Sequence, residues 1–222
     1  MQILVVCAHP DDEVLGAGGT IARHAMEGDE IEVAVLATGV TSRGGDTATL
    51  ARQLDVLRAS ARRASALMGV RALHLGDFED QGMDAVRLLH VVREVESHIR
   101  RVRPQTVYTH HHGDLNADHR VTYQAVLTAA RPTADLSVRR ILSFEVASST
   151  EWNVPYTFAP TVFVDISATI ETKFAALEAY DAETRPFPHP RSREALTAIA
   201  RRWGSVGGLE RAEAFQLVRE IR

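Results

Sequence analysis

Short apolar runs alternate along the chain with longer stretches in which apolar positions recur every three to four residues. The short runs are rich in β-branched residues and predict strands over residues 2–7, 31–37, 72–75, 106–109, 141–146 and 161–164. The longer stretches predict helices over residues 14–27, 50–68, 83–101, 119–130, 167–180, 193–202 and 209–221. Strands that alternate with helices of this length imply βαβ units. We therefore expect an α/β fold with a mostly parallel sheet in a layered αβα sandwich.

The length and composition favour a single domain over residues 1–222. Hydrophobic residues make up 45% of the chain and charged residues 24%, which is enough apolar material for one core. The sequence contains no internal repeat, no low-complexity tract and no clear domain boundary.

Charge and cysteine content narrow the classes of function. The chain carries 25 Lys and Arg against 29 Asp and Glu, a formal net charge of −4. A slightly acidic chain gives no support for nucleic-acid binding, which needs a basic face. Cys7 has no second cysteine to pair with. No apolar stretch reaches about 18 residues and Met1 leads directly into a strand pattern, so we expect a cytoplasmic protein without a membrane span.

Two dense polar clusters come directly after predicted strands. The first is HPDDE over residues 9–13, and the second is THHHGDLNADHR over residues 109–120. In open α/β sheets, ligands bind beyond the carboxyl ends of the strands. If the first and fourth strands are neighbours, the two clusters face each other across one site.

The residue types in these clusters suit a metal ion. Imidazole and carboxylate ligands together are typical of zinc, or of iron held by two histidines and one carboxylate. His9 and a carboxylate of the first cluster would supply two ligands, and His119 is the leading candidate for the third. Zinc can lower the pKa of a bound water from about 15.7 to about 7. The other carboxylate of the Asp11–Asp12 pair could then act as general base.

Simpler explanations exist for each residue alone. An Asp-Asp pair before a helix can be only an N-terminal cap. Single histidines such as His110, His111 and His112 are more often loop residues than ligands. Both clusters nevertheless fall on loops after predicted strands, and this shared location favours a metal-dependent hydrolase.

The AHPDDE motif after a first strand, with a later DH pair opening a helix, resembles the LmbE-like or PIG-L family of zinc-dependent N-deacetylases. This resemblance implies a Rossmann-like fold. It also implies zinc held by His9, Asp12 and His119, with Asp11 as the base. Iron(II) and other divalent metals are alternatives.

The likeness spans roughly residues 1–130, so we expect this part to hold the metal site. Residues 131–222 should then supply walls of the substrate pocket and the C-terminal elements. Family members are often oligomeric, which makes a homo-oligomer a further expectation.

The chain departs from the family pattern at Asn116, where many members carry a histidine three residues before the ligand histidine. That histidine is thought to stabilise the oxyanion or to protonate the leaving amine. Its role could pass to His110, His111, His112 or Asp114. Of these, His110 lies nearest the strand end and is favoured as a catalytic residue.

The GDLNADHR form resembles a bacterial branch found with sugar-modification pathways, which points to an acetamido sugar as the small-molecule substrate. The implied products are acetate and a free amine. One alternative is an amidase that acts on a non-sugar amide or a thiol conjugate. Another is a non-catalytic nucleotide-binding module of the same fold, although HPDDE occupies the turn where such modules carry their glycines.

Three residues outside the metal triad are candidates for substrate binding. They are Arg43 in a glycine-flanked loop, Asp114 in the second cluster and His189 in the proline-rich stretch PFPHPRS. Trp152, with Glu145, could form a pocket wall and stack on a sugar face. The alternatives are a solvated loop arginine for Arg43, surface packing for His189 and a core position for Trp152.

Overall fold

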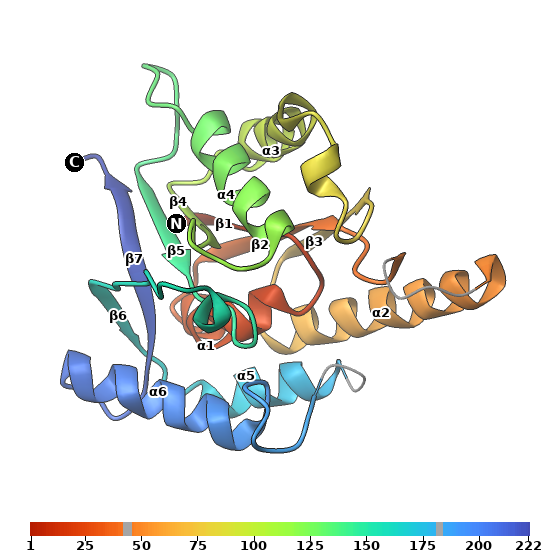
Figure 1. Cartoon of the computed structure of the whole chain (residues 1–222). Coiled ribbons are helices and arrows are strands. Elements are labelled where there is room, and N and C mark those ends of the chain that lie inside the picture. The colour runs from red at the N-terminus through yellow and green to blue at the C-terminus, as the bar shows by residue number, and fades with distance from the viewer. Residues whose placement is uncertain (42–45, 181–183) are drawn as a thin grey trace.

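The computed structural model describes residues 1–41, 46–180 and 184–222 and shows an αβα sandwich (Figure 1). The strands are β1 (Gln2–Cys7), β2 (Glu30–Ala37), β3 (Ala72–Phe78), β4 (Thr106–His110), β5 (Arg140–Phe144), β6 (Val162–Asp165) and β7 (Ala212–Glu220). The α-helices are α1 (Asp12–Met26), α2 (Thr47–Leu67), α3 (Leu88–Val102), α4 (Ala117–Ala129), α5 (Ile170–Glu178) and α6 (Arg193–Gly207). The described residues also form the short 3₁₀ helices η2 (Met83–Ala85) and η3 (Thr150–Trp152).

The described strands form one seven-stranded sheet in the order β3-β2-β1-β4-β5-β7-β6. The five strands from β3 to β5 run parallel, whereas β7 is antiparallel to both of its neighbours. The chain first winds outward from β1 to β3 and then returns to place β4 on the other side of β1. This reversal between β1 and β4 is the position at which open α/β sheets bind their ligands.

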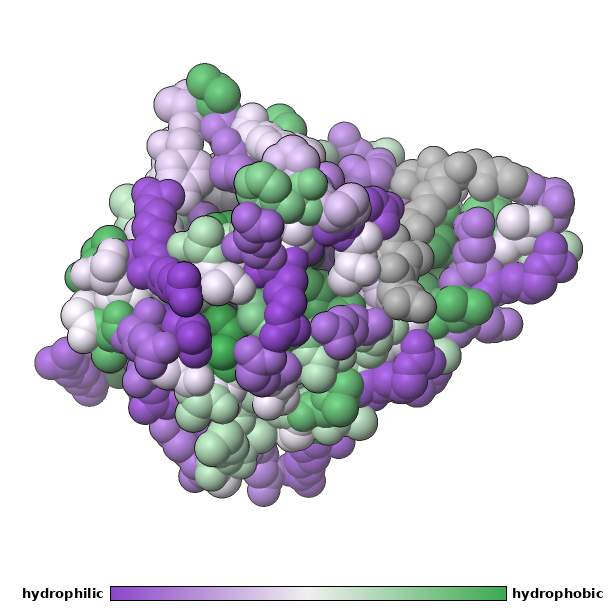
Figure 2. Space-filling model, turned by 90° about the horizontal axis from the view of Figure 1, so that it is seen from below, coloured by the Kyte–Doolittle hydropathy of each residue, from purple (hydrophilic) through white to green (hydrophobic). Residues whose placement is uncertain are grey.

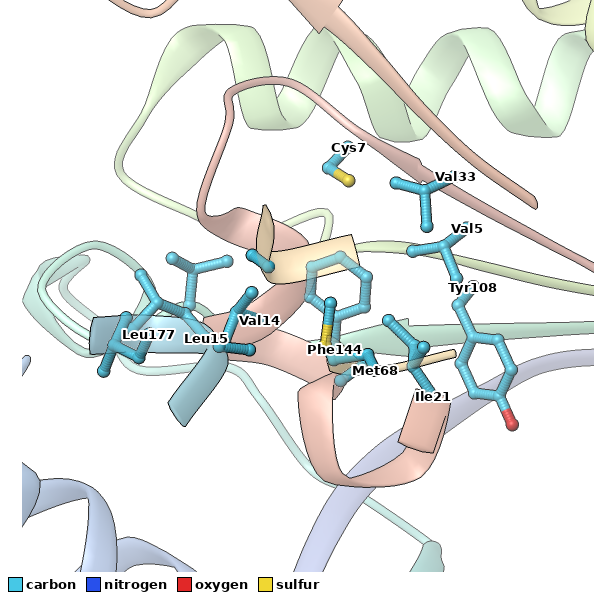
Figure 3. Packing of buried hydrophobic residues seen from close by; sticks show 14 of the residues in the cluster. Val5, Cys7, Val14, Leu15, Ile21, Val33, Met68, Tyr108, Phe144 and Leu177 are labelled. Atoms are coloured by element: carbon cyan, nitrogen blue, oxygen red, sulfur yellow. The ribbon is translucent and has the colours of Figure 1, made fainter. Parts of the chain in front are cut away.

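Alternate side chains of the strands enter two separate cores. In β1, Ile3 and Val5 pack toward α1, α2 and α5, whereas Leu4 and Val6 pack toward α3 and α4. Figure 1 shows these two groups of helices on opposite faces of the sheet, and Figure 3 shows the first core around Phe144. Residues 3–7 of β1 are fully buried, as expected for a central parallel strand. The predicted αβα sandwich is confirmed.

Helix α1 lies unusually close to the sheet because glycines face its neighbours. A Cβ atom on Gly16 would lie 2.2 Å from the Phe144 ring, and one on Gly19 would lie 2.8 Å from Ile166. The glycine-rich GAGGT segment therefore serves helix packing. This close approach fixes the direction in which the first turn of α1 points.

The predicted helix over residues 209–221 is wrong, because this segment forms β7. Helix α6 ends at Gly207, and Gly208 adopts the left-handed conformation that ends a helix, with φ of 72°. The chain then enters the gap between β5 and β6 and pairs with both strands. The backbone hydrogen bonds of two open strand edges outweigh the weak helical periodicity of a short apolar segment.

Polar side chains cover most of the face in Figure 2, with apolar side chains interspersed among them in smaller patches. Among the described residues, no helix has both the length and the apolar character needed to cross a membrane.

Candidate metal centre and active site

The two polar clusters meet at the carboxyl ends of β1 and β4. These strands pair in parallel, so the loop after Cys7 and the loop after His110 leave the sheet side by side. The first loop leads into α1 and the second into α4. The prediction that strands one and four are neighbours is therefore confirmed.

Three predicted ligands form a triangle at this edge. His9 Nδ1 lies 3.4 Å from Asp12 Oδ2 and 3.3 Å from His119 Nε2. The third side, from His119 Nε2 to Asp12 Oδ2, is 3.3 Å. Two ligand atoms at about 2.0–2.1 Å from a tetrahedral metal lie roughly 3.3–3.4 Å apart. The triangle therefore has the dimensions of one face of such a coordination shell.

Carboxylates hold the outer nitrogens of both imidazoles. His9 Nε2 lies 3.0 Å from Asp118 Oδ2 and 3.3 Å from Asp80 Oδ1. His119 Nδ1 lies 3.2 Å from Asp114 Oδ2. Such partners fix the ring orientation and leave the inner nitrogen free to donate its lone pair to a metal.

Asp118 and Asp80 contact His9, and the sequence analysis assigned neither of them a role. Asp118 is fully buried, and its carboxylate accepts the backbone N–H groups of Gln81 at 2.8 Å and Met83 at 3.0 Å. It therefore links α4 to the loop after β3 while it faces His9. The two residues of the DH pair therefore lie at different places: His119 is a corner of the triangle, and Asp118 contacts His9 from outside it.

The carboxylates give the site a strongly negative field. Burial lowers the pKa of His9, but hydrogen bonds to Asp118 and Asp12 outweigh it and raise this pKa to about 10. Burial is likewise outweighed at His119, where Asp12 and Asp114 raise the pKa to about 9. The neighbouring carboxylates therefore favour positive charge at both rings.

Asp11 lines the pocket beside the triangle. It adopts a left-handed conformation, with φ of 104°, and its side chain makes no capping hydrogen bond to α1. Its backbone N–H donates to Glu13 Oε2 at 3.1 Å, and Glu13 Oε1 accepts from the Tyr180 hydroxyl at 2.6 Å. Helix capping therefore does not explain this residue.

Arg191 reaches Asp11 from the last third of the chain. Its Nη1 donates to Asp11 Oδ2 at 2.7 Å, and its Nε donates to Ser148 Oγ at 2.8 Å. Among the residues that the structure describes, Arg191 is the one Lys or Arg side chain in the pocket lining. The sequence analysis missed it, since a lone arginine in a proline-rich loop forms no pattern.

The triangle and Asp11 open into a pocket of about 210 Å³. Its lining is almost entirely polar and comes from loops that are far apart in the sequence. The lining residues are His9, Pro10, Asp11, Asp12, Gly39, Asp80, Gln81, Asn116, His119, Ser148, Ser149 and Arg191.

His110 lies behind the ligands, outside the pocket lining. Its ring stacks on that of His119 with centroids 3.9 Å apart, and its Nε2 accepts the Ala8 N–H at 2.8 Å. Burial and the charge of His119 lower the pKa of His110 to about 3, so the ring is neutral. The structure therefore places this residue against the predicted ligand His119.

Asp114 also lies outside the pocket lining and is fully buried. Its oxygens accept hydrogen bonds from the hydroxyls of Ser149 and Thr150, in addition to the contact with His119. Burial raises its pKa, but the contacts with His119 outweigh it and bring the pKa to about 2. It is placed to orient His119.

The remaining candidates lie around or away from the pocket. His189 is half-buried near its rim, with its ring 6.2 Å from that of Trp152. Trp152 is exposed, so it is not a core residue. Glu145 instead accepts from Trp203 Nε1 at 2.6 Å, outside the pocket lining. Arg43 lies outside the described residues.

The sequence is similar to a family of deacetylases and to named members of it. The profile of PIG-L, described as GlcNAc-PI de-N-acetylase, matches residues 4–130. The diacetylchitobiose deacetylase of Thermococcus kodakarensis is 28% identical, over 98% of this chain and 83% of that protein. The 1D-myo-inositol 2-acetamido-2-deoxy-alpha-D-glucopyranoside deacetylase of Mycobacterium sp. strain JLS is 30% identical, over 86% of this chain and 77% of that protein.

Solved structures share the whole fold. The conserved protein TT1542 of Thermus thermophilus has a TM-score of 0.80 at 26% identity, covering 100% of this chain and 97% of that one. GalB of Pseudomonas putida KT2440, a 4-carboxy-2-hydroxymuconate hydratase, has a TM-score of 0.80 at 25% identity. The match covers 100% of this chain and 98% of GalB. Because a hydratase shares this fold, the fold alone does not identify the reaction.

Proposed function

This chain belongs to the PIG-L family of deacetylases, and on that premise we propose that it removes the N-acetyl group from an acetamido sugar or sugar conjugate. The products would be acetate and a free amine. The ligand triangle of His9, Asp12 and His119, with Asp11 beside it, is the observation that carries the proposal. The named relatives support a sugar as the carrier of the acetamido group.

The donor set fits a zinc ion. Two imidazole nitrogens and one carboxylate oxygen, spaced as on one face of a tetrahedron, are a common catalytic zinc set, with iron(II) as the alternative. When bound to these residues, such an ion would polarise the acyl carbonyl and make a water molecule more acidic.

Asp11 is the residue that we assign as general base. Its carboxylate lines the pocket beside the ligand triangle, within reach of a water that attacks the carbonyl carbon. Arg191 pairs with Asp11 Oδ2 and fixes the direction of the carboxylate. After attack, the protonated Asp11 can return its proton to the nitrogen of the departing amine.

Asn116 is the residue that we assign to the substrate oxygen. It lines the pocket, and its Oδ1 already accepts the Asp118 N–H at 2.9 Å. Its Nδ2 group is therefore the donor that remains for the developing oxyanion. A neutral amide cannot transfer a proton, so proton return falls to Asp11 rather than to this position.

Acetate release under metal control tests the proposal. We expect about one zinc or iron per chain, loss of acetate release from N-acetylglucosamine oligomers after chelation, and recovery when the metal is restored. Asp11→Asn should lower kcat about 10²–10⁴-fold with unchanged metal content. The exposed carboxylate Asp77, changed in Asp77→Asn, is the matched control. Undiminished release by the metal-free protein would refute the proposal.

Hydration of a carboxylated substrate is a second candidate, because GalB aligns over the full length of this chain. Such an activity would add water to a carbon–carbon double bond and release no acetate. A panel that contains acetamido sugars, non-sugar amides and an unsaturated dicarboxylate separates the reactions.

The expected cytoplasmic location and the expected homo-oligomer stay predictions.

A further inference from the structure

The pocket is too small to enclose a whole glycoside. Its volume of about 210 Å³ lies below the roughly 300–1,000 Å³ of pockets that enclose an entire small-molecule ligand. The acetamido group and the adjoining part of a sugar ring can enter. Whatever else the substrate carries must rest on the loops around the mouth of the pocket.

Three of these loops are joined to one another. Asn153 Nδ2 donates to the Gly113 carbonyl at 3.0 Å, which ties the loop after β5 to the loop after β4. The contact of Arg191 with Ser148 ties the loop before α6 to the same segment. The rings of Trp152 and His189 meet edge to face, at an interplanar angle of 84°. These contacts hold the three segments next to one another.

Each of these loops exposes a large apolar side chain close to its pocket-lining residue. Leu115 precedes Asn116, Trp152 and Val154 follow Ser149, and Phe187 precedes Arg191. The exposed fractions are 51% for Leu115, 51% for Trp152, 89% for Val154 and 59% for Phe187. We call these four residues the apolar rim.

We propose that the apolar rim binds an aryl or alkyl group attached to the acetamido sugar. The inference rests on the proposed function and specifies its substrate class: a glycoside or conjugate that combines a polar acetamido sugar with an apolar substituent. The polar pocket would take the acetamido end. The apolar rim would remove the substituent from water.

The composition of the apolar rim favours this occupant over a second sugar ring. Trp152 alone could stack on a sugar face, as aromatic residues often do. Leu115 and Val154 offer neither a flat ring nor a hydrogen bond, so they add little to the binding of a hydroxylated ring. They match carbon-rich groups, which gain from contact with any apolar surface.

Direct binding of a matched glycoside pair tests the inference. The probes are the methyl and phenyl glycosides of 2-acetamido-2-deoxyglucose, with dissociation constants measured by calorimetry on the metal-loaded Asp11→Asn protein. We expect the phenyl glycoside to bind about tenfold more tightly, since added apolar carbons contact the apolar rim. Trp152→Ser and Phe187→Ser should each reduce this preference without changing the affinity for the methyl glycoside.

Val206→Ser supplies the control, because Val206 is 59% exposed on α6 and lies outside the apolar rim. It should leave the preference unchanged. Equal affinities for the two glycosides would overturn the inference. It would also be overturned if the protein were a dimer that dissociates in Trp152→Ser and showed no preference for the phenyl glycoside, because the apolar rim would then be a contact between two copies of the chain. Absence of acetate release would instead count against the proposed function, because the binding comparison needs no turnover.

Discussion

The two parts of the chain contribute to the active site in different ways. Residues 1–130 supply the ligand triangle and Asp11 from loops at the ends of parallel strands. Residues 131–222 supply Arg191, Ser148 and Ser149, which close the pocket from the other side. The first part places its groups in two short clusters, 110 positions apart, that the pairing of β1 with β4 brings together. The second reaches the same pocket through contacts that span most of the chain.

This difference teaches where chemistry and specificity are located. The ligand set depends on the β1–β4 junction, whose geometry follows from parallel pairing. The apolar rim and Arg191 depend largely on irregular segments, which can change without disturbing that junction. We therefore expect relatives to share the metal chemistry and to differ in the substituent that they accept.

Removal of a ligand should have the largest effect. His119→Ala deletes one corner of the triangle, so we expect loss of bound metal and a fall in kcat/KM of at least about 10³-fold. His112→Ala is the matched control, since His112 is an exposed histidine of the same cluster. Metal content and acetate release are measured for both variants. Full metal occupancy in His119→Ala would contradict the assigned ligand set.

Loss of the buried Lys173 should come next, through stability. Its Nζ donates to Glu213 Oε1 at 2.6 Å and to the Leu15 carbonyl at 2.9 Å, which joins α5, β7 and α1. Lys173→Met leaves the Glu213 carboxylate buried without its cation. We expect the free energy of unfolding to fall by about 3–5 kcal/mol in urea titrations.

The control for this change is Arg100→Met, which removes an exposed ion pair with Glu96. That pair should contribute less than about 1 kcal/mol. Equal effects of the two variants would show that the last third of the chain is not anchored to α1 through Lys173.

Replacement of Arg191 should have the smallest effect of the three. Arg191→Gln removes the ion pair with Asp11 Oδ2, so we expect kcat/KM to fall about 10–100-fold while the metal stays bound. Arg191→Lys should give an intermediate value. Arg185→Gln, in the exposed part of the same loop, is the control. An unchanged kcat/KM would show that the ion pair of Arg191 with Asp11 does not contribute to catalysis.

The sequence analysis predicted the αβα architecture because long strand and helix patterns are local. It also predicted that the two polar clusters meet, because both lie at strand ends, whereas the choice of Asp12 over Asp11 as ligand came from the resemblance to the PIG-L family. It missed β7, since a short apolar segment fits either a helix or a strand until its neighbours are known.

Arg191, Asp80 and Asp118 could not be assigned from sequence for a different reason. Each role depends on a contact between distant segments, such as the 180 positions between Arg191 and Asp11. Asp114 and His110 show the converse limit. Their residue types fit a pocket, but both contact His119 and neither is among the residues that line the pocket, so their predicted roles stay predictions.

The position of β7 has a consequence for synthesis of the protein. Among the described strands, β6 pairs with β7 alone, and β7 follows it in the chain after α5 and α6. While the chain leaves the ribosome, the outer edge of β5 therefore stays open until β7 arrives. During this interval the nascent chain presents an unpaired edge next to a nearly complete sheet, where chaperones or a second nascent chain could bind.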